Sequence, residues 1–328
     1  MTIERVHRVS VVIPTFNRRA GLSQVVNPLL DDPSTGEVIL VVDGSQDGSL
    51  EFLREWSVSE PRIRAIFQEN SGQATARQLG VESARFDVVV MLDDDVIPND
   101  RLISGHAKWH VAADRIVVVG YSPTKVPAHR LPGQVSTRLY AQSYENTCAA
   151  YEADPGAILT NLWAGNLSMR RLVALEIGLA NAPRLPYHED MQFGIRCELA
   201  GVSAVFDRSL LAWHSYDRTL NQFVAECGNS GRARAQLLTE FPDYAGSIHP
   251  LSSLNNFQAL MVRALATDLI RPITSRFARA TSTLAGKLRL WKLETWSIRI
   301  VRQVEVYRAF KCVTAPSPRS PATVGEIK

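Results

Sequence analysis

Short runs of β-branched and other apolar residues alternate with segments of helical periodicity through the first hundred residues. Runs of this kind, bounded by turn residues, are typical of buried parallel strands. They lie at 9–13, 38–42, 63–67 and 88–92. Between them apolar residues recur at helical spacing, as in Leu22, Val25, Val26 and Leu29. This alternation predicts an α/β domain with a mostly parallel sheet flanked by helices.

The pattern is less regular between residues 99 and 218. The predicted elements, in chain order, are a helix at 102–111, a strand at 116–119, a helix at 135–151, a strand-like segment at 158–169, helices at 171–179 and 187–201, and a short strand at 203–207. A long Pro-containing stretch precedes the helix at 135–151. Long loops in compact α/β domains often cover a substrate.

From residue 220 onward the pattern is helical. Residues 221–241 predict one helix with potential breaks at Gly228 and Gly231, and 251–311 predict two or more amphipathic helices. The Pro- and Ser-rich end has the composition of a disordered tail. The expected organisation has three parts: an α/β domain at 1–218, a helical basic extension at 219–313 and a disordered tail at 314–328.

Charge divides the chain at a similar place. Residues 251–328 contain 13 Lys and Arg against 4 Asp and Glu, whereas the first 250 residues contain 23 against 29. A basic helical extension fits three interpretations: a solvated face with a homodimer seam, an anchor on an anionic membrane surface, or an acceptor-binding extension. No recognised nucleic-acid-binding motif accompanies the charge, which argues against a nucleic-acid partner.

The compartment is predicted from cysteines and hydropathy. Cys148, Cys197, Cys227 and Cys312 are far apart and form no C-x-x-C pair, as expected of reduced thiols. The chain opens into a strand without a signal-peptide pattern, and no apolar stretch approaches the roughly 20 residues of a spanning helix. We expect a cytoplasmic protein, soluble or peripheral on the inner face of the membrane.

Carboxylates follow two of the predicted strands. Asp43 ends the second strand, and Asp93, Asp94 and Asp95 follow the fourth. Open α/β sheets bind their ligands at the carboxyl ends of strands. Three adjacent like charges raise one another's pKa unless a cation lies among them. The triplet is therefore either a solvated turn or helix cap, or a site for a divalent metal and a phosphate.

Two common nucleotide-binding motifs are absent. No G-x-G-x-x-G follows a strand, which argues against the usual dinucleotide fold. No G-x-x-x-x-G-K-[ST] occurs either, which argues against a P-loop NTPase.

Six segments together resemble the family 2 glycosyltransferases, the inverting GT-A enzymes that use nucleotide-sugar donors. They are VSVVIPTFNR at 9–18, VVDGSQDGS at 41–49, ENSGQATARQLG at 69–80, MLDDD at 91–95, AGNLSMRR at 164–171 and HEDMQFGIR at 188–196. Their order is that of the family. Val42 stands where the family often has a second Asp, and Gln78 where it often has Asn. The resemblance implies a GT-A (Rossmann-like) fold, with nucleotide-sugar binding in 1–98 and the acceptor part in 99–218.

For the donor, the resemblance implies contacts near the strand ends. Asp43 would accept a hydrogen bond from the nucleobase, and Arg77 would meet the diphosphate or complete the base pocket. The alternatives are an Asx turn for Asp43 and a helix-face salt bridge for Arg77. The other donor-binding candidates are Pro14, Thr15, Asn17, Asp93 and Asp94.

The resemblance also implies a divalent metal at the triplet. Asp95 would contact the metal directly, and Asp93 would bind the ribose or bind the metal through water. Hard oxygen ligands that also touch phosphates suit Mn²⁺ or Mg²⁺. His214 is either a further metal ligand or a structural histidine.

The catalytic base is implied to lie in the Glu189–Asp190 pair, with Asp190 as the base. Acidic residues are also favoured at a helix N-terminus, so capping is the competing interpretation. The base would take the proton of the acceptor hydroxyl while that hydroxyl attacks C1 opposite the diphosphate. Trp163, Gly165 and Asn166 would form the floor of the sugar or acceptor pocket, or a tight turn.

The resulting hypothesis is a metal-dependent inverting glycosyltransferase of hexosyltransferase type. It would move a sugar from a nucleotide donor, expected to be a UDP-sugar, to a carbohydrate, lipid-linked or small-molecule acceptor. The alternatives are a nucleotidyltransferase and a catalytically silent carbohydrate-binding or scaffold protein. TFNRR at 15–19 lacks the glycines of a nucleotidyltransferase phosphate loop, and the combination of Asp43, Asp95 and Asp190 argues against a silent protein.

Overall fold

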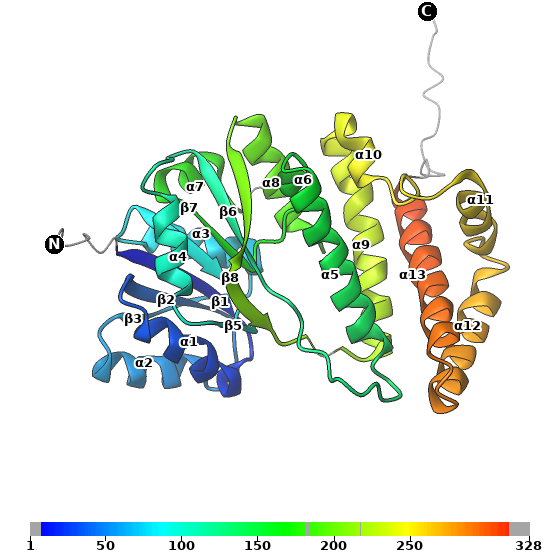
Figure 1. The fold of residues 1–328 in the computed structure, drawn as a ribbon, viewed down its shortest axis with the longest axis horizontal. Helices are drawn as coiled ribbons and strands as arrows, with labels where there is room; N and C mark the ends of the chain where they lie inside the picture. The colour runs from blue at the N-terminus through cyan, green and yellow to red at the C-terminus, as the bar shows by residue number, and fades with distance from the viewer. Residues whose placement is uncertain (1–7, 181–183, 217, 315–328) are drawn as a thin grey trace, which may run out of the picture. The chain divides into compact units, whose positions relative to one another are not determined.

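The computed structural model describes residues 8–180, 184–216 and 218–314. The chain divides into two compact units, which follow one another at Arg218 and Thr219. The first, called here the α/β unit, includes Glu189–Arg218 and the residues up to Arg184. The second, the helical unit, takes Leu185–His188 and the residues from Thr219 onward. Figure 1 shows the elements of both units.

Within the described residues, the α/β unit contains one eight-stranded sheet in the order β3-β2-β1-β4-β7-β6-β8-β5. The strands are β1 (Val9–Thr15), β2 (Thr35–Asp43), β3 (Ile63–Gln68), β4 (Val88–Leu92), β5 (Val96–Pro98), β6 (Ile116–Tyr121), β7 (Asn166–Arg170) and β8 (Ser203–His214). β1 to β4 are mutually parallel, as are β6 and β8, while β7 runs antiparallel to β4 and β6, and β5 to β8. The predicted parallel sheet is confirmed for its first four strands, and the later strands make it mixed.

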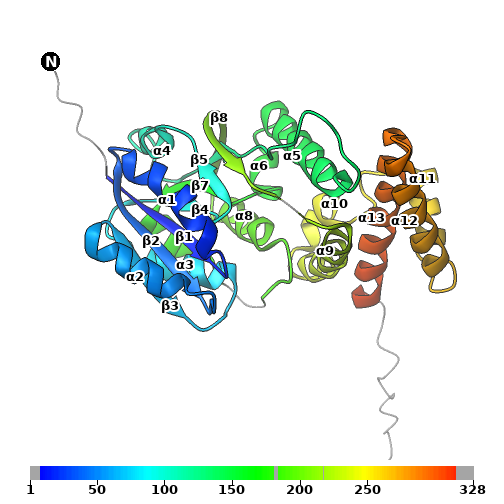
Figure 2. The same cartoon turned by 90° about the horizontal axis from the view of Figure 1, so that it is seen from below.

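Helices cover both faces of this sheet (Figures 1 and 2). They are α1 (Leu22–Asp31), α2 (Ser49–Ser59), α3 (Gln73–Ser83), α4 (Leu102–Trp109), α5 (Val135–Ala153), α6 (Ala157–Thr160), α7 (Arg171–Ile177) and α8 (Glu189–Leu199). Successive side chains of a strand point to opposite faces, so Val11 and Val12 of β1 belong to two separate buried cores. The core with Val11 includes α1 and α4; the core with Val12 includes α3, α6 and α8.

Two predicted strands differ from the structure. The apolar segment at 158–169 divides into helix α6 and strand β7, because Ile158 and Leu159 are buried as helix residues. A short apolar run fits a helix turn or a strand equally well. The last strand, predicted at 203–207, continues to His214, because alternate residues toward its end, Leu210, Ala212 and His214, are buried.

The helical unit contains α9 (Leu220–Glu240), α10 (Ala245–Ile248), α11 (Asn256–Leu265), α12 (Arg271–Lys287) and α13 (Trp291–Thr314). α13 lies between α9 on one side and α11 and α12 on the other (Figures 1 and 2). The two or more amphipathic helices expected after residue 251 are confirmed. None of the helices within the described residues is both long enough and apolar enough to cross a membrane. Residues 315–328 of the predicted tail lie outside the described residues.

α9 is continuous through Gly228 and Gly231, so the predicted break is wrong. At Gly231 the glycine serves helix packing instead. An added Cβ there would overlap the Val306 carbonyl oxygen and lie 2.8 Å from the Cβ of Ala309, both in α13. The absence of a side chain lets α9 and α13 approach closely.

Two buried histidines, His106 of α4 and His110 at its C-cap, hydrogen-bond to β7. His106 Nε2 lies 2.9 Å from Asn166 Oδ1, and its Nδ1 lies 2.8 Å from Ser168 Oγ. His110 Nε2 lies 2.8 Å from the same hydroxyl. Because Asn166 Oδ1 only accepts, we assign a proton of His106 to Nε2. Burial lowers the pKa of both His106 and His110 to about 4.

These histidines predict acid sensitivity. An unfolded histidine titrates near 6.5, so between pH 6.5 and 4 the unfolded chain binds protons that the folded chain does not. Stability is therefore full above pH 6.5 and falls as the pH drops toward 4, by about 3 kcal/mol for His106 alone. Urea unfolding at pH 7 and pH 5 measures the part of this loss that falls between pH 6.5 and 5, about 2 kcal/mol for His106. His106→Gln should flatten the pH dependence, whereas His129→Gln at an exposed loop position should leave it unchanged; equal slopes would contradict the assignment.

Candidate active site

The candidate residues gather at the carboxyl ends of β1, β2 and β4. β1 pairs with β2 on one side and β4 on the other, which is the switch point at which open α/β sheets bind ligands. Thr15 ends β1, Asp43 ends β2, and the Asp triplet follows β4. Residues that are distant in the sequence are therefore brought to one edge.

Asp93, Asp94 and Asp95 form a turn, not the extended segment that would point alternate carboxylates to one side. The Val96 N–H donates to the Asp93 carbonyl at 3.1 Å, and the chain enters β5. Neighbouring segments fix the turn: Asp93 N–H donates to the Gly165 carbonyl at 3.1 Å, and Ser215 N–H to the Asp95 carbonyl at 2.8 Å. The three carboxylates consequently have three different environments.

Arg18 is the cation beside Asp94 and Asp95. Its Nη2 lies 2.8 Å from Asp95 Oδ2, and its Nε lies 3.7 Å from Asp94 Oδ1. Burial raises the pKa of Asp94 to about 7, and repulsion from Asp95 adds to that shift. Burial alone would also raise the pKa of Asp95, but His214, followed by Arg18, holds it below its usual range. Arg18 is not among the site residues predicted from the sequence, although its place just after β1, the strand that pairs with β4, was an available signal.

Arg77 of α3 joins the triplet to the candidate base. Its Nη2 lies 2.6 Å from Asp93 Oδ1, and its Nη1 lies 2.6 Å from Asp190 Oδ1. The arginine is only 2% exposed, yet the two carboxylates outweigh burial and raise its pKa above the usual value. The guanidinium is thus charged and forms two salt bridges. In the structure these salt bridges connect Asp93 to Asp190 and do not lie on an exposed helix face.

Asp190 lies in the first turn of α8, and both of its carboxylate oxygens have a protein partner. Arg77 contacts Oδ1, and the Ala164 N–H donates to Oδ2 at 2.9 Å. Its side chain remains 24% exposed. For the neighbouring Glu189, burial and the adjacent Asp190 raise the pKa. The pair therefore differs: Asp190 is held by a cation and an N–H, whereas burial and Asp190 raise the pKa of Glu189.

Asp43 organises the loop before α3. Its Oδ1 accepts from Gln68 Nε2 and Ser71 N–H, each at 2.7 Å, and its Oδ2 accepts from Gly72 N–H at 2.9 Å. These contacts agree with a turn-stabilising role, and they also fix the carboxylate at the strand end. Pro14 and Thr15 are buried residues of β1.

Asn17 ties the loop after β1 to the loop after β2. Its Oδ1 accepts from Gln46 N–H at 2.9 Å, and its own N–H donates to Ser45 Oγ at 3.0 Å. The residue adopts a left-handed backbone with φ of 52°, which asparagine tolerates better than most residues. Two loops of the candidate donor pocket are thereby held together.

The three candidate floor residues occupy different places. Trp163 is half-buried, and its ring lies 5.5 Å from those of Tyr144 and His214. Gly165 contacts the triplet through its carbonyl. Asn166 is completely buried and bonds His106 and the Leu210 carbonyl, so it supports the core and does not line a pocket.

Gly165 is required by its distance to Asp93. An added Cβ would lie 2.5 Å from Cη2 and Cζ2 of the Trp163 ring and 2.7 Å from Asp93 Oδ2, closer than these atoms can approach, so both side chains would have to move. Gly165→Ala is expected to displace Asp93 and to weaken donor binding or turnover by up to about 10²-fold. Calorimetric donor binding and steady-state rates measure the effect. Gly246→Ala, where no atom lies within 4 Å, is the matched control; unchanged activity of Gly165→Ala would show that the present positions of Asp93 and Trp163 are not required.

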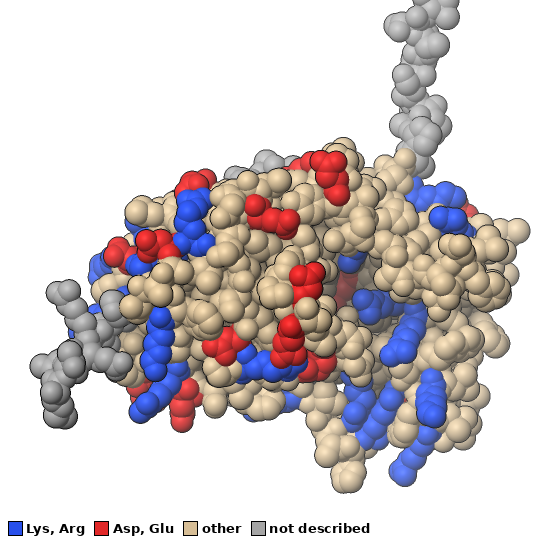
Figure 3. All heavy atoms as spheres, turned by 45° about the horizontal axis from the view of Figure 1, so that its top comes forward, with Lys and Arg blue, Asp and Glu red and all other residues tan. Residues whose placement is uncertain are grey.

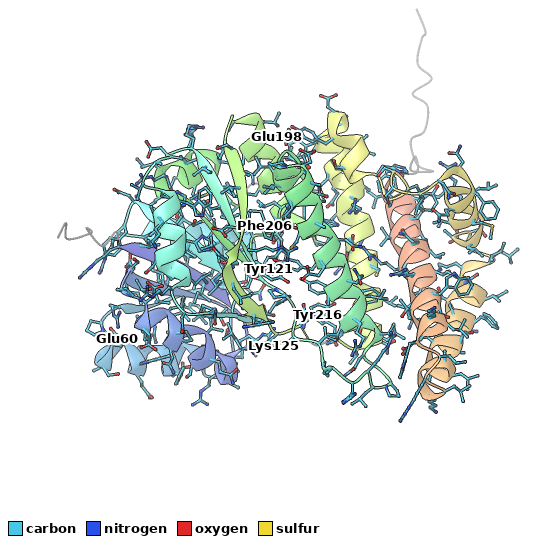
Figure 4. The ribbon with its side chains drawn as sticks, viewed as in Figure 1. Glu60, Tyr121, Lys125, Glu198, Phe206 and Tyr216 are labelled. Atoms are coloured by element: carbon cyan, nitrogen blue, oxygen red, sulfur yellow. The ribbon has the colours of Figure 1, made fainter. Side chains whose placement is uncertain are left out.

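His214 ends β8 beside Asp95, with Nε2 at 3.4 Å from Asp95 Oδ1. Aromatic rings surround it: Tyr140 of α5 lies 5.3 Å away and stacks on Tyr216 at 3.9 Å. Figure 4 shows Tyr216 beside the lower part of α5. Within the described residues no group of three or more His, Cys, Asp and Glu side chains could by itself hold a metal ion. Asp95 and His214 supply one carboxylate and one imidazole.

Comparison with known proteins identifies the first half of the chain. Residues 10–155 match the family model described as "Glycosyl transferase family 2". The matched residues make up less than half of the chain and are similar to that family. The Asp triplet, Arg18, Asp43 and Arg77 all lie within that match, whereas Asp190 and His214 lie beyond it.

Curated relatives share this glycosyltransferase domain. An uncharacterized glycosyltransferase of Haemophilus influenzae is 35% identical over 97 residues, which are 29% of this chain and 39% of that protein. The uncharacterized glycosyltransferase YfnE of Bacillus subtilis is 30% identical over 115 residues, 34% of this chain and 29% of that protein. An undecaprenyl-phosphate 4-deoxy-4-formamido-L-arabinose transferase of Aeromonas hydrophila is 39% identical over 94 residues, 27% of this chain and 29% of that protein. The alignments thus span less than half the length of these relatives.

A solved structure shares the fold over most of the chain. The mannosyltransferase PcManGT from Pyrobaculum calidifontis, in complex with GDP-Man and Mn²⁺, superposes with a TM-score of 0.58. The superposition covers 92% of this chain and 86% of that chain, at 15% sequence identity. The glycosyltransferase domain therefore has the GT-A fold expected from the sequence.

Proposed function

We propose that the protein transfers a sugar from a nucleoside-diphosphate sugar to an acceptor hydroxyl by a single displacement with inversion. The observation that carries this proposal is the Arg77 bridge. One buried guanidinium holds Asp93, at the candidate donor site, and Asp190, the candidate base, each at 2.6 Å. A single displacement needs donor and base in one fixed relation, because the base must act as the acceptor attacks.

In this proposal Asp190 takes the proton from the acceptor hydroxyl. Arg77 and the Ala164 N–H each use one lone pair of a carboxylate oxygen, and an ionised carboxylate has about four such acceptor sites. The remaining sites and the 24% exposure of the side chain leave room for a hydroxyl. The attack forms the new C1–O bond as the bond to the diphosphate breaks, so no covalent enzyme intermediate is needed.

Asp95 and His214 fit a divalent cation as part of a shared site. They offer a carboxylate oxygen and an imidazole nitrogen 3.4 Å apart, and Mg²⁺ or Mn²⁺ commonly takes its other ligands from substrate phosphates and water. When bound, the cation would neutralise charge on the departing diphosphate. The Mn²⁺ complex of the mannosyltransferase supports use of a metal. Arg18, which contacts Asp94 and Asp95, would also stabilise negative charge at this edge.

For the nucleobase of the sugar donor and for the acceptor, we propose only the chemical class. The mannosyltransferase of similar fold binds GDP-Man, so a GDP-sugar stands beside the UDP-sugar predicted from the sequence. The Aeromonas relative, whose name gives undecaprenyl phosphate, supports a lipid-linked acceptor among those considered. We propose a cytoplasmic location, for which the four free cysteines are the support.

Donor hydrolysis tests the reaction. The whole chain is incubated with UDP- and GDP-sugars, with Mn²⁺ or Mg²⁺ and with a chelator, and released nucleoside diphosphate is measured. We expect release from at least one donor, and its loss on chelation. No metal-dependent release from any donor, with or without simple acceptor sugars, would refute the proposal.

A further inference from the structure

α12 presents its large apolar side chains to solvent and its small ones to the protein. The exposed residues are Ile273, Phe277, Leu284 and Leu288, which are 69%, 71%, 59% and 59% exposed. The buried residues of the helix are Ala278, Ser282, Ala285 and Gly286. An ordinary surface helix has the reverse arrangement, with large apolar residues toward the core. At 3.6 residues per turn the four exposed residues fall on one side of the helix, and we call them the α12 stripe.

α11 repeats this arrangement. Phe257, Leu260 and Met261 are 71%, 61% and 42% exposed, whereas Val262 is buried. Spacings of three and four residues place the three exposed side chains on one helix face. α11 and α12 lie on the same side of α13, away from α9, in both views of the ribbon (Figures 1 and 2). The α12 stripe with Phe257, Leu260 and Met261 is called the outer face.

The outer face is accompanied by positive charge. Residues 256–299 contain eight Lys and Arg and two Asp and Glu. Of the acids, Glu294 is 2% exposed, and Asp268 lies 3.6 Å from Arg308. Arg276 and Lys287 are exposed and immediately precede the stripe residues Phe277 and Leu288. In Figure 3, Lys and Arg gather on the lower right of the visible face, where the C-terminal helices lie.

We propose that the outer face binds the surface of a lipid bilayer that contains anionic phospholipids. Large apolar side chains on a helix that carries flanking cations insert to the boundary of headgroups and acyl chains, and the cations bind lipid phosphates. Exposed apolar patches accompanied by polar residues often mark sites of interaction with a protein or a membrane. The proposal concerns where the protein works and does not depend on the proposed glycosyl transfer.

A second copy of the chain is the competing occupant, and charge disfavours it. Pairing two outer faces would bring Arg276 and Lys287 near their own copies, with one exposed acid, Asp268, between residues 256 and 299 to offset them. Like charges across an interface are costly. An anionic bilayer supplies the opposite charge over the whole face.

Vesicle sedimentation of the full-length chain, without any sugar donor, tests the proposal. We expect binding to vesicles of phosphatidylcholine with phosphatidylglycerol, little binding to phosphatidylcholine alone, and weakening as salt is raised. Phe277→Glu with Leu284→Glu should weaken binding at least about 100-fold, because two apolar side chains lose their burial. Arg276→Gln with Lys287→Gln should weaken it about 25-fold, since each cation near an anionic surface contributes about fivefold.

Matched controls use exposed residues of the α/β unit. Val58→Glu with Leu199→Glu makes the same change from apolar to acidic, and Arg54→Gln with Lys108→Gln removes the same charges; both should bind as the unaltered chain does. Thermal unfolding checks that each variant is folded. If Phe277→Glu with Leu284→Glu does not fold, the proposal is tested by Arg276→Gln with Lys287→Gln. Absent binding, or binding that all variants share, overturns the proposal. If the unaltered chain is a dimer that does not bind vesicles, and Phe277→Glu with Leu284→Glu makes it a monomer, the outer face binds a second copy of the chain.

Discussion

Asp190→Asn is expected to lower turnover about 10²–10⁴-fold while donor binding changes little, because the variant removes the base and not the donor site. The side chain keeps its size and can still offer an oxygen to Arg77. Its amide group, however, would then face the Ala164 N–H, which now donates to Oδ2 at 2.9 Å. Donor affinity by calorimetry and stability by thermal unfolding therefore need to be measured with the rate.

Glu189→Gln is the matched control, since it removes the neighbouring carboxylate in the same helix turn. Glu189 is not the residue assigned as the base, so Glu189→Gln should have the smaller effect on turnover. Wild-type turnover by Asp190→Asn, or an equal loss in both variants, would show that the base has been assigned to the wrong residue.

The sheet was predictable because its strands are buried on both sides. β1, β2 and β4 are rich in β-branched residues, since both faces of the sheet lie under helices, and such runs are visible in sequence. Ile158 and Leu159 form an equally apolar run, yet they are buried in a helix of four residues. Composition alone cannot distinguish a buried strand from a buried short helix, because the segment against which the apolar run packs determines its conformation.

The sequence predicted which segments form the site, but not which of their side chains contact one another. Strand ends bring Asp43 and the triplet to one edge, because parallel strands share an edge for their carboxyl ends. The partners of those residues come from distant segments: Arg77 and Asp190 are 113 residues apart. Asn166 shows what the sequence cannot reveal. It belongs to a motif of the site, yet its side chain hydrogen-bonds to His106 and the Leu210 carbonyl in the core.

The helical unit shows a related limit. The sequence indicates that α12 is amphipathic, with arginines beside apolar residues, but it does not indicate which face is covered. The structure covers Ala278 and Ala285 and leaves Phe277 and Leu284 exposed. Hydrophobicity would have predicted the opposite packing, and only the close approach of α12 to α13 accounts for the choice of small residues.

Arg77→Met is expected to lower the free energy of unfolding by about 3–5 kcal/mol, because it leaves two carboxylates in a buried site without their shared cation. Asp93 and Asp190 each lose a contact of 2.6 Å. Arg77→Lys keeps the charge but lacks the planar fork that reaches both carboxylates, so about 1.5–3 kcal/mol should be lost with the missing charged hydrogen bond. Urea unfolding measures both variants. Arg115→Met is the control, since its contact with Glu176 is exposed to solvent and should contribute little to stability.

A double-mutant cycle then separates stability from catalysis. If Arg77 acts on Asp190 directly, Asp190→Asn should cost less stability in the Arg77→Met background than in the unaltered chain, because the repulsion between Asp93 and Asp190 is already present there and the second change relieves it. Turnover should behave otherwise: Arg77→Met should lower it by loosening the base, and adding Asp190→Asn should bring it to the level of the Asp190→Asn variant alone. Additive losses in both measurements would mean that Arg77 and Asp190 act independently, and that the bridge does not couple donor site and base.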